Sequence, residues 1–319
     1  MKKLLKALMW LVIAVLVLAI GFVAFLEIRG IPSYPTTTLS LKIESTPEKV
    51  ANGEKIAAML CNGCHLSTQT NKVTGRLMLD LPKEFGTIHS FNITQDKEYG
   101  IGKYSDAELV YLLRTGIKRD GSFNPVMPKF AKLSDYDIES IVSYLHSDRP
   151  EVQANNTPNV ECDYSLLSKF LCLVAFKPSE YPDKPIANPD TTNLLAYGKY
   201  LCVDLYACYA CHSADFKTLD YVNPEKSGGF FGGGNHLLDL EGRLVLSANI
   251  TPDEETGIGN WSLERFDRAL RSGLVQDGPA LRYPMMPHAR LSDLEVKAIY
   301  SYLKTVPKLK NKVERHLES

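Results

Sequence analysis

The 319-residue chain has no excess of charge of either sign, because 36 Lys and Arg residues face 37 Asp and Glu residues and the formal net charge is −1. This balance gives no indication of a nucleic-acid partner. The chain also has no convincing series of alternating apolar and polar residues, the pattern that predicts strands. Its glycine-rich run at 227–234 is not followed by Gly-Lys-Ser or Gly-Lys-Thr, so this run is not a phosphate-binding loop. With 45% hydrophobic residues the chain is nevertheless globular in composition, and it is long enough for two domains.

One segment differs from this globular average. A basic head of three lysines precedes an apolar run from Ala7 to Leu26 that contains no charged residue. That run is long enough to span a bilayer as a helix, whereas a cleavable signal peptide has a shorter apolar core and a small-x-small cleavage site. We therefore predict that residues 1–30 are an uncleaved signal anchor in the cytoplasmic membrane. Its basic end is cytoplasmic and the rest of the chain is periplasmic. A cleaved signal peptide is the alternative.

Two short segments share the pattern Cys-x-x-Cys-His. They are Cys61-Asn62-Gly63-Cys64-His65 and Cys208-Tyr209-Ala210-Cys211-His212. This pattern is the attachment signature of c-type haem, in which the cysteines form thioethers to the porphyrin and the histidine ligates the iron. We therefore expect two covalently bound haem c groups. Their attachment residues are Cys61, Cys64, Cys208 and Cys211, and the proximal iron ligands are His65 and His212.

The surroundings of the two motifs are repeated as well. The tripeptide Asn92-Ile93-Thr94 recurs 157 residues later as Asn249-Ile250-Thr251, Asp120-Gly121 recurs at the same offset as Asp277-Gly278, and Leu133-Ser134-Asp135 recurs 158 residues later as Leu291-Ser292-Asp293. A repeat of this length predicts two homologous domains. The predicted parts are the anchor 1–30, an extended stalk 31–41, a first domain 42–148, a Pro- and Asn-rich linker 149–189, a second domain 190–309 and a tail 310–319.

Within each unit the apolar periodicity is helical. One helix leads into each motif, over about 47–60 and 194–205. A second helix follows a capping box of Ser105 and Glu108 and ends at Gly116, and residues 261–273 repeat that layout. The last helices begin at Ser134 and Ser292. The predicted fold is therefore all-α, with two tandem domains behind one transmembrane helix.

A low-spin electron-transfer haem needs a second axial ligand opposite the histidine, and methionine raises its potential. We expect this ligand in an extended loop before the last helix of each unit, where Met127 lies in the first. The second unit offers Met285 and Met286. Counting back without gaps from Leu291-Ser292-Asp293 selects Met285, whereas aligning the Met-Pro dipeptides selects Met286. We prefer Met285 and keep Met286 as the alternative.

Three cysteines lie outside the motifs, and an exported domain permits a disulfide among them. The pairings considered are Cys162–Cys172 and Cys172–Cys202, with one cysteine left over. Cys202 or another spare cysteine is also an alternative thiolate ligand of an iron.

Other residues carry further expectations. His89 and His236 are alternative distal ligands, and Arg76 and Arg243 are candidates for pairing with haem propionates. The glycine-rich run lets the backbone pass close to a porphyrin edge. The Asn-Ile-Thr segments match a glycosylation sequon, but their repetition beside Gly-Ile-Gly favours a shared loop architecture.

The stretch from Asn249-Ile250-Thr251-Pro252-Asp253 to Gly257-Ile258-Gly259-Asn260-Trp261-Ser262, followed by Phe266 and Arg271-Ser272-Gly273, resembles the membrane-anchored class I dihaem cytochromes c. These are similar to the cytochrome c subunits of periplasmic alcohol and gluconate dehydrogenases. The resemblance covers about residues 45–305. It implies the cytochrome c fold, His/Met ligation and passage of electrons from a periplasmic donor to a respiratory chain. Those dehydrogenase subunits usually carry three haems, whereas this chain has two motifs.

The leading interpretation is a non-catalytic electron carrier. Two haems in adjacent domains pass electrons between a periplasmic or membrane dehydrogenase and a terminal oxidase or other respiratory complex, and the membrane tether raises the effective concentration near such partners. The alternative is a haem enzyme with one open or Cys-ligated iron, either a dihaem peroxidase or a thiosulfate dehydrogenase. A methionine in both domains argues against the peroxidase. The sequence names neither donor nor acceptor, nor the order of the two potentials.

Overall fold

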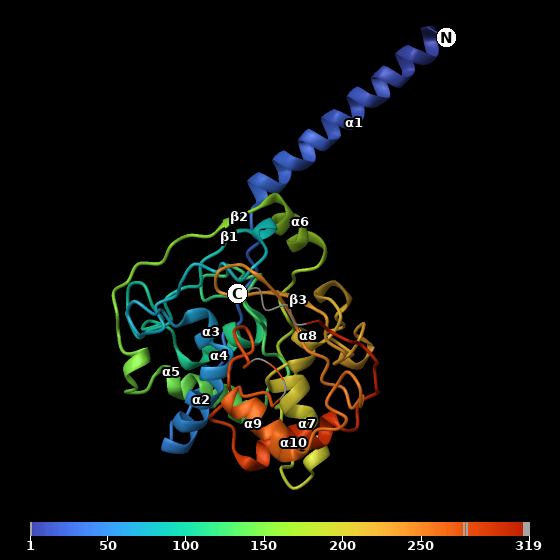
Figure 1. The fold of residues 1–319 in the computed structure, drawn as a ribbon. Coiled ribbons are helices and arrows are strands. Elements are labelled where there is room, and N and C mark those ends of the chain that lie inside the picture. The colour runs from blue at the N-terminus through green and yellow to red at the C-terminus, as the bar shows by residue number, and fades with distance from the viewer. Residues whose placement is uncertain (1, 277, 279, 315–319) are drawn as a thin grey trace.

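The computed structural model of this chain describes residues 2–276, 278 and 280–314. One long helix projects from a rounded body that holds the other elements (Figure 1). This helix, α1, runs Lys2–Arg29 and covers the predicted anchor. Among the described residues it is the one helix long and apolar enough to cross a membrane. Met1, Asp277 of the repeated Asp-Gly pair and the end of the predicted tail (315–319) lie outside the described residues.

The helices of the first unit begin where the sequence predicts. Helix α2 is Pro47–Leu60, and the hydroxyl of Thr46 caps it. Helix α4, Asp106–Thr115, has the predicted capping box of Ser105 and Glu108 and ends at Gly116 in the left-handed conformation. Helix α5, Asp135–Leu145, starts after Ser134. The short helix α3 (Asn62–His65) and the 3-10 turns η1 (Lys83–Phe85) and η2 (Pro150–Val152) complete the unit.

The second unit repeats this layout with one change. Helices α9 (Leu263–Ser272) and α10 (Asp293–Leu303) match α4 and α5, and α8 (Cys208–His212) carries the second motif. The helix that leads into the motif is α7 (Leu194–Lys199), which continues as a π-helix, η3 (Tyr200–Leu205). Two 3-10 turns, η4 (Phe216–Thr218) and η5 (Pro224–Lys226), follow.

The π-helix absorbs extra residues. Gly53 and Gly198 are 145 positions apart, whereas the first cysteines of the two motifs, Cys61 and Cys208, are 147 apart. Two more residues therefore separate glycine from cysteine in the second unit. A π-helix takes up inserted residues because its hydrogen bonds span five positions instead of four. The second motif is thereby reached while Gly198 keeps the crossing position of Gly53.

A helix crossing organises each unit. Helix α2 packs against α5, and α7 packs against α10. The crossing point is a glycine in both cases, because a Cβ atom on Gly53 would lie 1.8 Å from the carbonyl oxygen of Ser140, and one on Gly198 would lie 2.0 Å from that of Ala298. Only glycine allows such close approach of two backbones. The two crossings are equivalent in the repeat.

Two small sheets depart from the all-α prediction. Strand β1 (Gly86–Thr87) pairs antiparallel with β2 (Asp163–Tyr164), and β3 (His236–Leu238) pairs antiparallel with β4 (Leu244–Leu246). Helices account for 41% of the chain, so the all-α class is not confirmed. Strands of two or three residues are too short to produce an alternating pattern, and β1 finds its partner far along the chain, in the predicted linker. The linker also contains a helix, α6 (Leu166–Val174).

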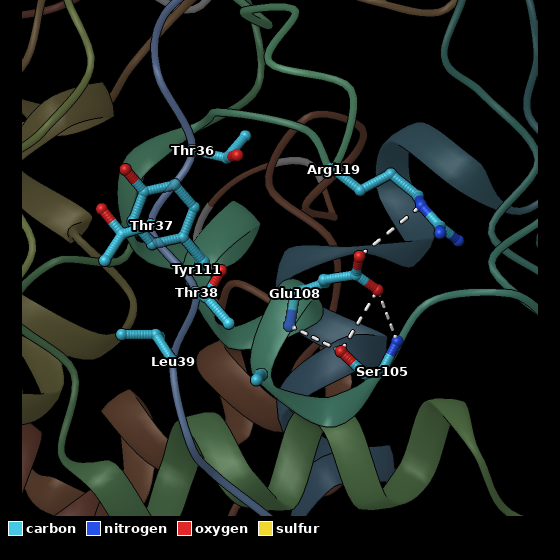
Figure 2. Close-up of a pocket in the computed structure, with 9 residues that line it drawn as sticks. Thr36, Thr37, Thr38, Leu39, Ser105, Glu108, Tyr111 and Arg119 are labelled. Atoms are coloured by element: carbon cyan, nitrogen blue, oxygen red, sulfur yellow. Dashed lines mark hydrogen bonds and ion pairs between the residues drawn. The ribbon is translucent and has the colours of Figure 1, made fainter.

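The predicted stalk is extended and lies against the first unit. The backbone N–H of Tyr34 donates to the carbonyl oxygen of Gly121 at 2.8 Å. Residues 36–39 then pass α4, where a shallow pocket opens between this segment and the helix (Figure 2). Glu108 of the capping box lies there, with its carboxylate 3.6 Å from the guanidinium of Arg119. The residues lining this pocket include none of the Cys, His or Met residues of the predicted haem sites.

The two units contact each other reciprocally. Lys55 of α2 pairs with Glu295 of α10 at 2.5 Å, and the hydroxyl of Tyr200 in η3 donates to Asp137 of α5 at 2.5 Å. Lys55 and Tyr200 are equivalent positions of the repeat, as are Asp137 and Glu295. Buried apolar residues of both units also form one continuous core. The repeat is therefore not divided into two independent cores.

Candidate functional site

Each Cys-x-x-Cys-His motif is wound into a tight helical turn. In the first motif the N–H groups of Cys64 and His65 donate to the carbonyl oxygen of Cys61 at 3.1 and 2.8 Å. Cys61 itself continues from α2, because its N–H donates to Ala57 of that helix. The helix crossing at Gly53 thus fixes the place of the first motif. In the second unit the π-helix η3 ends just before α8 and does the same for the second motif.

Both motif histidines are oriented through the same ring atom. Nδ1 of His65 lies 2.7 Å from the carbonyl oxygen of Phe91, and Nδ1 of His212 lies 2.8 Å from that of Ala248. Since a carbonyl oxygen only accepts, Nδ1 carries the proton in both rings. The tautomer with Nδ1 protonated presents Nε2 to a metal. Burial also lowers the pKa of His65, which favours the neutral imidazole that ligation requires.

A glycine with positive φ donates a hydrogen bond to the backbone of each motif histidine. Gly75 donates its N–H to the carbonyl oxygen of His65 at 2.8 Å, and Gly233 donates to that of His212 at 2.7 Å. Their φ angles are +85° and +69°. A Cβ atom on either glycine would lie within 2.5 Å of the backbone of the loop whose carbonyl group accepts from the motif histidine. This is the use of Gly233 in the glycine-rich run. The run turns around the second motif and brings two backbones together.

The Asn-Ile-Thr segments are structural. Asn92 and Asn249 are buried, and the Oδ1 atom of each accepts from both the N–H and the hydroxyl of the threonine two residues later. Their Nδ2 groups donate to backbone carbonyls beyond the last helix of each unit, such as that of Asn155 at 2.8 Å and that of Leu309 at 2.7 Å. The shared loop architecture predicted from the repeat is confirmed.

The loop that contains Met127 is held from α4. Fully buried Arg114 donates to three carbonyl oxygens between Phe130 and Leu133 and to the carboxylate of Asp135 at 2.6 Å. The N–H of Phe130 donates to Leu113 at 2.8 Å, three residues after Met127. Arg114 has a counterpart 157 residues later in Arg271, which also donates to a carbonyl oxygen before the last helix, that of Leu291 at 3.3 Å.

The corresponding hydrogen bond in the second unit shows which of the two candidate methionines is equivalent to Met127. The N–H of His288 donates to Leu270 at 2.8 Å, as Phe130 does to Leu113. Met285 lies three residues before His288, which makes it the positional counterpart of Met127. Both Met127 and Met285 pack against the hydrophobic core, whereas the side chain of Met286 is 50% exposed.

The seven cysteines are all unpaired, so the predicted disulfide is absent. Cys162 instead exchanges hydrogen bonds with the backbone of His89, and Cys172 is a fully buried residue of α6. Burial raises the pKa of the Cys61 thiol to about 12 and that of Cys211 to about 11. The hydrogen bond with Cys202 lowers the pKa of the Cys208 thiol, so the four motif cysteines do not share one direction of shift.

Cys202 has a structural explanation. It stands at the position of Ala57 in the repeat, and both side chains are fully buried. Burial raises the pKa of the Cys202 thiol well above its ordinary value, and this thiol is hydrogen-bonded to Cys208. A protonated thiol packed between helices lacks the character of a thiolate ligand.

The two arginines considered for propionates have different surroundings. Arg243 is exposed and pairs with Asp239 at 2.7 Å on the β3–β4 hairpin. Arg76 is part of the first motif's surroundings, since its Nη2 atom donates to the carbonyl oxygen of Gly63 at 2.7 Å and to the carboxylate of Asp80 at 2.8 Å. The hydroxyl of Tyr283 also donates to Asp80. Tyr283 belongs to the second unit and lies two residues before Met285, so a polar contact joins the surroundings of the two sites.

The remaining histidine alternatives are less well placed. His89 pairs through its backbone with Leu77 and Cys162, and His236 is exposed on β3. His288, which the sequence analysis did not single out, is the histidine near His212, and burial lowers its pKa to about 4.

The donor set suits haem. Each unit supplies two thiols, an imidazole held in the ligating tautomer and a thioether packed on the core, which together match covalent attachment and two axial ligands. Within the described residues no group of three His, Cys, Asp or Glu side chains is arranged to hold a bare metal ion.

Comparison with known proteins identifies the first unit. Residues 48–145 match the family described as cytochrome C oxidase, cbb3-type, subunit III. Residues 48–145 are a cytochrome c-type domain. This cytochrome c-type domain contains α2 to α5, the first motif and Met127.

Three relatives extend the similarity beyond that domain. The cytochrome c subunit of the quinone alcohol dehydrogenase of Gluconobacter oxydans is 29% identical over 81% of this chain and 55% of its own length. The gluconate 2-dehydrogenase cytochrome c subunit of Pantoea cypripedii is 30% identical over 81% of this chain and 59% of its own length. A dihaem cytochrome c-type protein of Cereibacter sphaeroides is 27% identical over 84% of this chain and 92% of its own length. The chain thus spans little more than half the length of the two dehydrogenase subunits.

Proposed function

We propose that this chain is a dihaem c-type cytochrome that carries electrons and is not itself a catalyst. Haem c would be attached at Cys61 and Cys64 in the first unit and at Cys208 and Cys211 in the second. The observation that carries the proposal is the repeated orientation of the two motif histidines, each with Nδ1 bonded to a backbone carbonyl. The names of the relatives support a haem electron carrier, since they are cytochrome c subunits of dehydrogenases and a dihaem cytochrome c.

The proposed axial pairs are His65 with Met127 and His212 with Met285. The burial of Met285 and its position three residues before the His288–Leu270 bond support it over Met286. The haem supplies the one-electron chemistry when bound. The residues of this chain do the rest: one backbone carbonyl orients each imidazole, burial favours the neutral form of His65, and the apolar core excludes water from the ligand side.

The proposed partners are redox proteins. By analogy with the named relatives we infer a dehydrogenase as donor and a respiratory complex as acceptor. We also propose that α1 anchors the chain in the cytoplasmic membrane with the haem units on the periplasmic side. The buried position of Leu26, where α1 meets the body, supports α1 as a permanent part of the protein over a cleaved signal peptide.

The alternative of a haem enzyme has less support. A thiosulfate dehydrogenase would need a cysteine ligand on one iron, whereas Cys202 is fully buried at the position that Ala57 occupies in the first unit. A peroxidase would need an open iron, and each unit offers a core-packed methionine.

Optical spectra of the purified, membrane-extracted protein test the proposal. We expect a methionine-to-iron charge-transfer band in the near infrared when the protein is oxidised, no carbon monoxide binding when it is reduced, and two haems per chain by pyridine haemochrome assay. A high-spin signal, or carbon monoxide bound at one iron, would contradict the closed His/Met sites and call for assays of peroxide and thiosulfate turnover.

A further inference from the structure

Helix α6 has one face fixed to the body. The hydroxyl of its N-cap, Ser165, accepts from the N–H of Ser168, and the hydroxyl of Ser168 donates to the carbonyl oxygen of Phe85 at 2.8 Å. Four residues further on, Cys172 is fully buried on the same side. The helix is thus held against η1 and the β1–β2 pair, and its orientation is determined.

The opposite face of α6 is apolar and exposed. Leu167, Phe170 and Val174 follow at spacings of three and four residues, so they share one side of the helix. They are 41%, 38% and 62% exposed, and Leu166 beside them is 39% exposed. A soluble protein rarely leaves such a stripe in water.

Helix α1 indicates what covers this stripe. The two helices pack together at the foot of α1 (Figure 1). The ring of Phe170 lies edge-on to the ring of Phe22, with centroids 6.2 Å apart, and Lys169 pairs with Glu27 at 2.5 Å. Glu27 ends the apolar run of α1, whereas Phe22 lies inside it. At 1.5 Å per residue, Phe22 is about 6 Å below Leu26 along the helix axis.

These contacts set the depth of α6. If α1 spans the bilayer with its apolar run, Phe22 lies below the headgroups, and so does the ring of Phe170 that touches it. Lys169, on the other side of α6, is level with the polar end of the run. A helix that is apolar below and polar above at this depth fits the boundary between headgroups and acyl chains, where amphipathic helices bury their apolar face by about 5–10 Å.

We propose that α6 is a membrane-surface helix whose apolar stripe, Leu166, Leu167, Phe170 and Val174, is inserted into the bilayer that α1 crosses. This inference rests on the proposed membrane anchor. It means that the body is held to the membrane at two places, and that the first unit cannot rotate freely about α1.

Photolabelling of the wild-type, haem-loaded full chain tests the proposal. The protein is reconstituted in vesicles of phosphatidylcholine and phosphatidylglycerol, a lipid-soluble diazirine is added and photolysed, and peptides are mapped by mass spectrometry. We expect carbene adducts on α1 and on residues 166–174. We expect none around Val222 of the second unit, which is 79% exposed and serves as an internal control.

The outcomes separate this inference from the anchor. Adducts on α1 but not on α6 would overturn it and leave the anchor intact, whereas adducts on neither would overturn the anchor as well. Labelling of α6 that appears only on dilution of the protein into lipid would show that a second copy covers the stripe, which also overturns it. The double variant Phe170→Glu/Val174→Glu should reduce adducts on α6 several-fold and leave those on α1 unchanged. Val222→Glu is the matched control.

Discussion

At the scale of single residues, the proposed iron sites depend on where one atom points. The carbonyl groups of Phe91 and Ala248 fix the motif histidines, and the bond from His288 to Leu270 sets the register of the second methionine loop. Because Met285 and Met286 are adjacent, they point in different directions, and one packs on the core while the other is half exposed. This difference supports our proposal that Met285 is the residue that ligates the iron.

Replacing these methionines one at a time tests that assignment. In Met285→Ala we expect about half of the haem to bind carbon monoxide after reduction, because one of two sites has lost its distal ligand. The near-infrared band should fall in proportion. Met286→Ala is the matched control and should behave like the wild type. The reverse pattern would assign the ligand to Met286.

Asp96 makes the repeated Gly-Ile-Gly loop sensitive to acid. Its Oδ1 atom accepts from the N–H groups of Glu98 and Tyr99 at 2.9 and 2.8 Å, and these bonds lower its pKa. A carboxylate whose pKa is lower in the folded state stabilises the fold above its ordinary value of about 4 and loses that contribution as the pH falls through the folded value.

We therefore expect Asp96→Asn to lower the urea midpoint at pH 7, and the difference from wild type to shrink as the pH falls below about 4. Asp148→Asn, which removes an exposed carboxylate, is the control and should have little effect at either pH. Parallel curves for the Asp96 variant and wild type over the whole range would refute this role for Asp96.

At the scale of elements, each unit is built on one close helix crossing. Gly53 and Gly198 let α2 and α7 approach α5 and α10, and the motifs follow at the ends of these helices. The position of each haem motif is therefore set by a residue eight or ten positions before its first cysteine.

Gly198→Ala should force the two helices apart, because the added Cβ would lie 2.0 Å from the carbonyl oxygen of Ala298. We expect a loss of stability of about 1–3 kcal/mol, the usual cost of overpacking. Gly21→Ala in α1 is the control, since a Cβ there has nothing within 4 Å. Thermal unfolding of both holoproteins measures the difference, and equal midpoints would count against the crossing.

At the scale of the whole molecule, the two proposed haem sites are mechanically linked. Arg76 and Asp80 flank the first motif, and the hydroxyl of Tyr283 reaches them from the loop that holds Met285. Movement of one loop is thus resisted by the other unit.

Tyr283→Phe removes this link and keeps the ring. A hydrogen bond to a charged group contributes about 1.5–3 kcal/mol, so we expect external imidazole to displace the second-site methionine about ten-fold more readily than in wild type. Binding at the first site should not change. Tyr221→Phe, at an exposed ring, is the control. Imidazole titrations followed at the Soret band measure the effect, and unchanged affinities at both sites would disprove the coupling.

The parts of this fold that depend on local signals could be predicted from the sequence. Ser105, Gly116, Ser134 and Ser292 mark helix ends through bonds to their own neighbours, and the structure confirms each. The Asn-Ile-Thr loops could also be predicted, because their repetition indicated the same loop structure in both units. The domain boundaries and the iron ligands stay predictions.

Features that depend on distant partners could not be predicted. Strand β1 pairs with a segment in the linker, and the apolar linker helix α6 docks on α1 and the first unit. The strand pairing leaves no pattern in the residues that make it. The apolar residues from Leu166 to Phe176 do indicate that this segment docks, but they do not name its partners. The disulfide considered among the spare cysteines is absent for the same reason, since Cys202 of the second unit occupies the place of Ala57 and is not paired with a cysteine of the linker.

The reciprocal contact between the units has an evolutionary consequence. Lys55 meets Glu295 and Tyr200 meets Asp137 through equivalent positions, which is how two identical subunits meet across a two-fold axis. A single-unit ancestor could form this interface as a homodimer before any duplication of its gene. Fusion through residues 149–189 would then have linked the two subunits of an existing homodimer covalently. After the fusion, each copy was free to acquire its own residue at the shared positions.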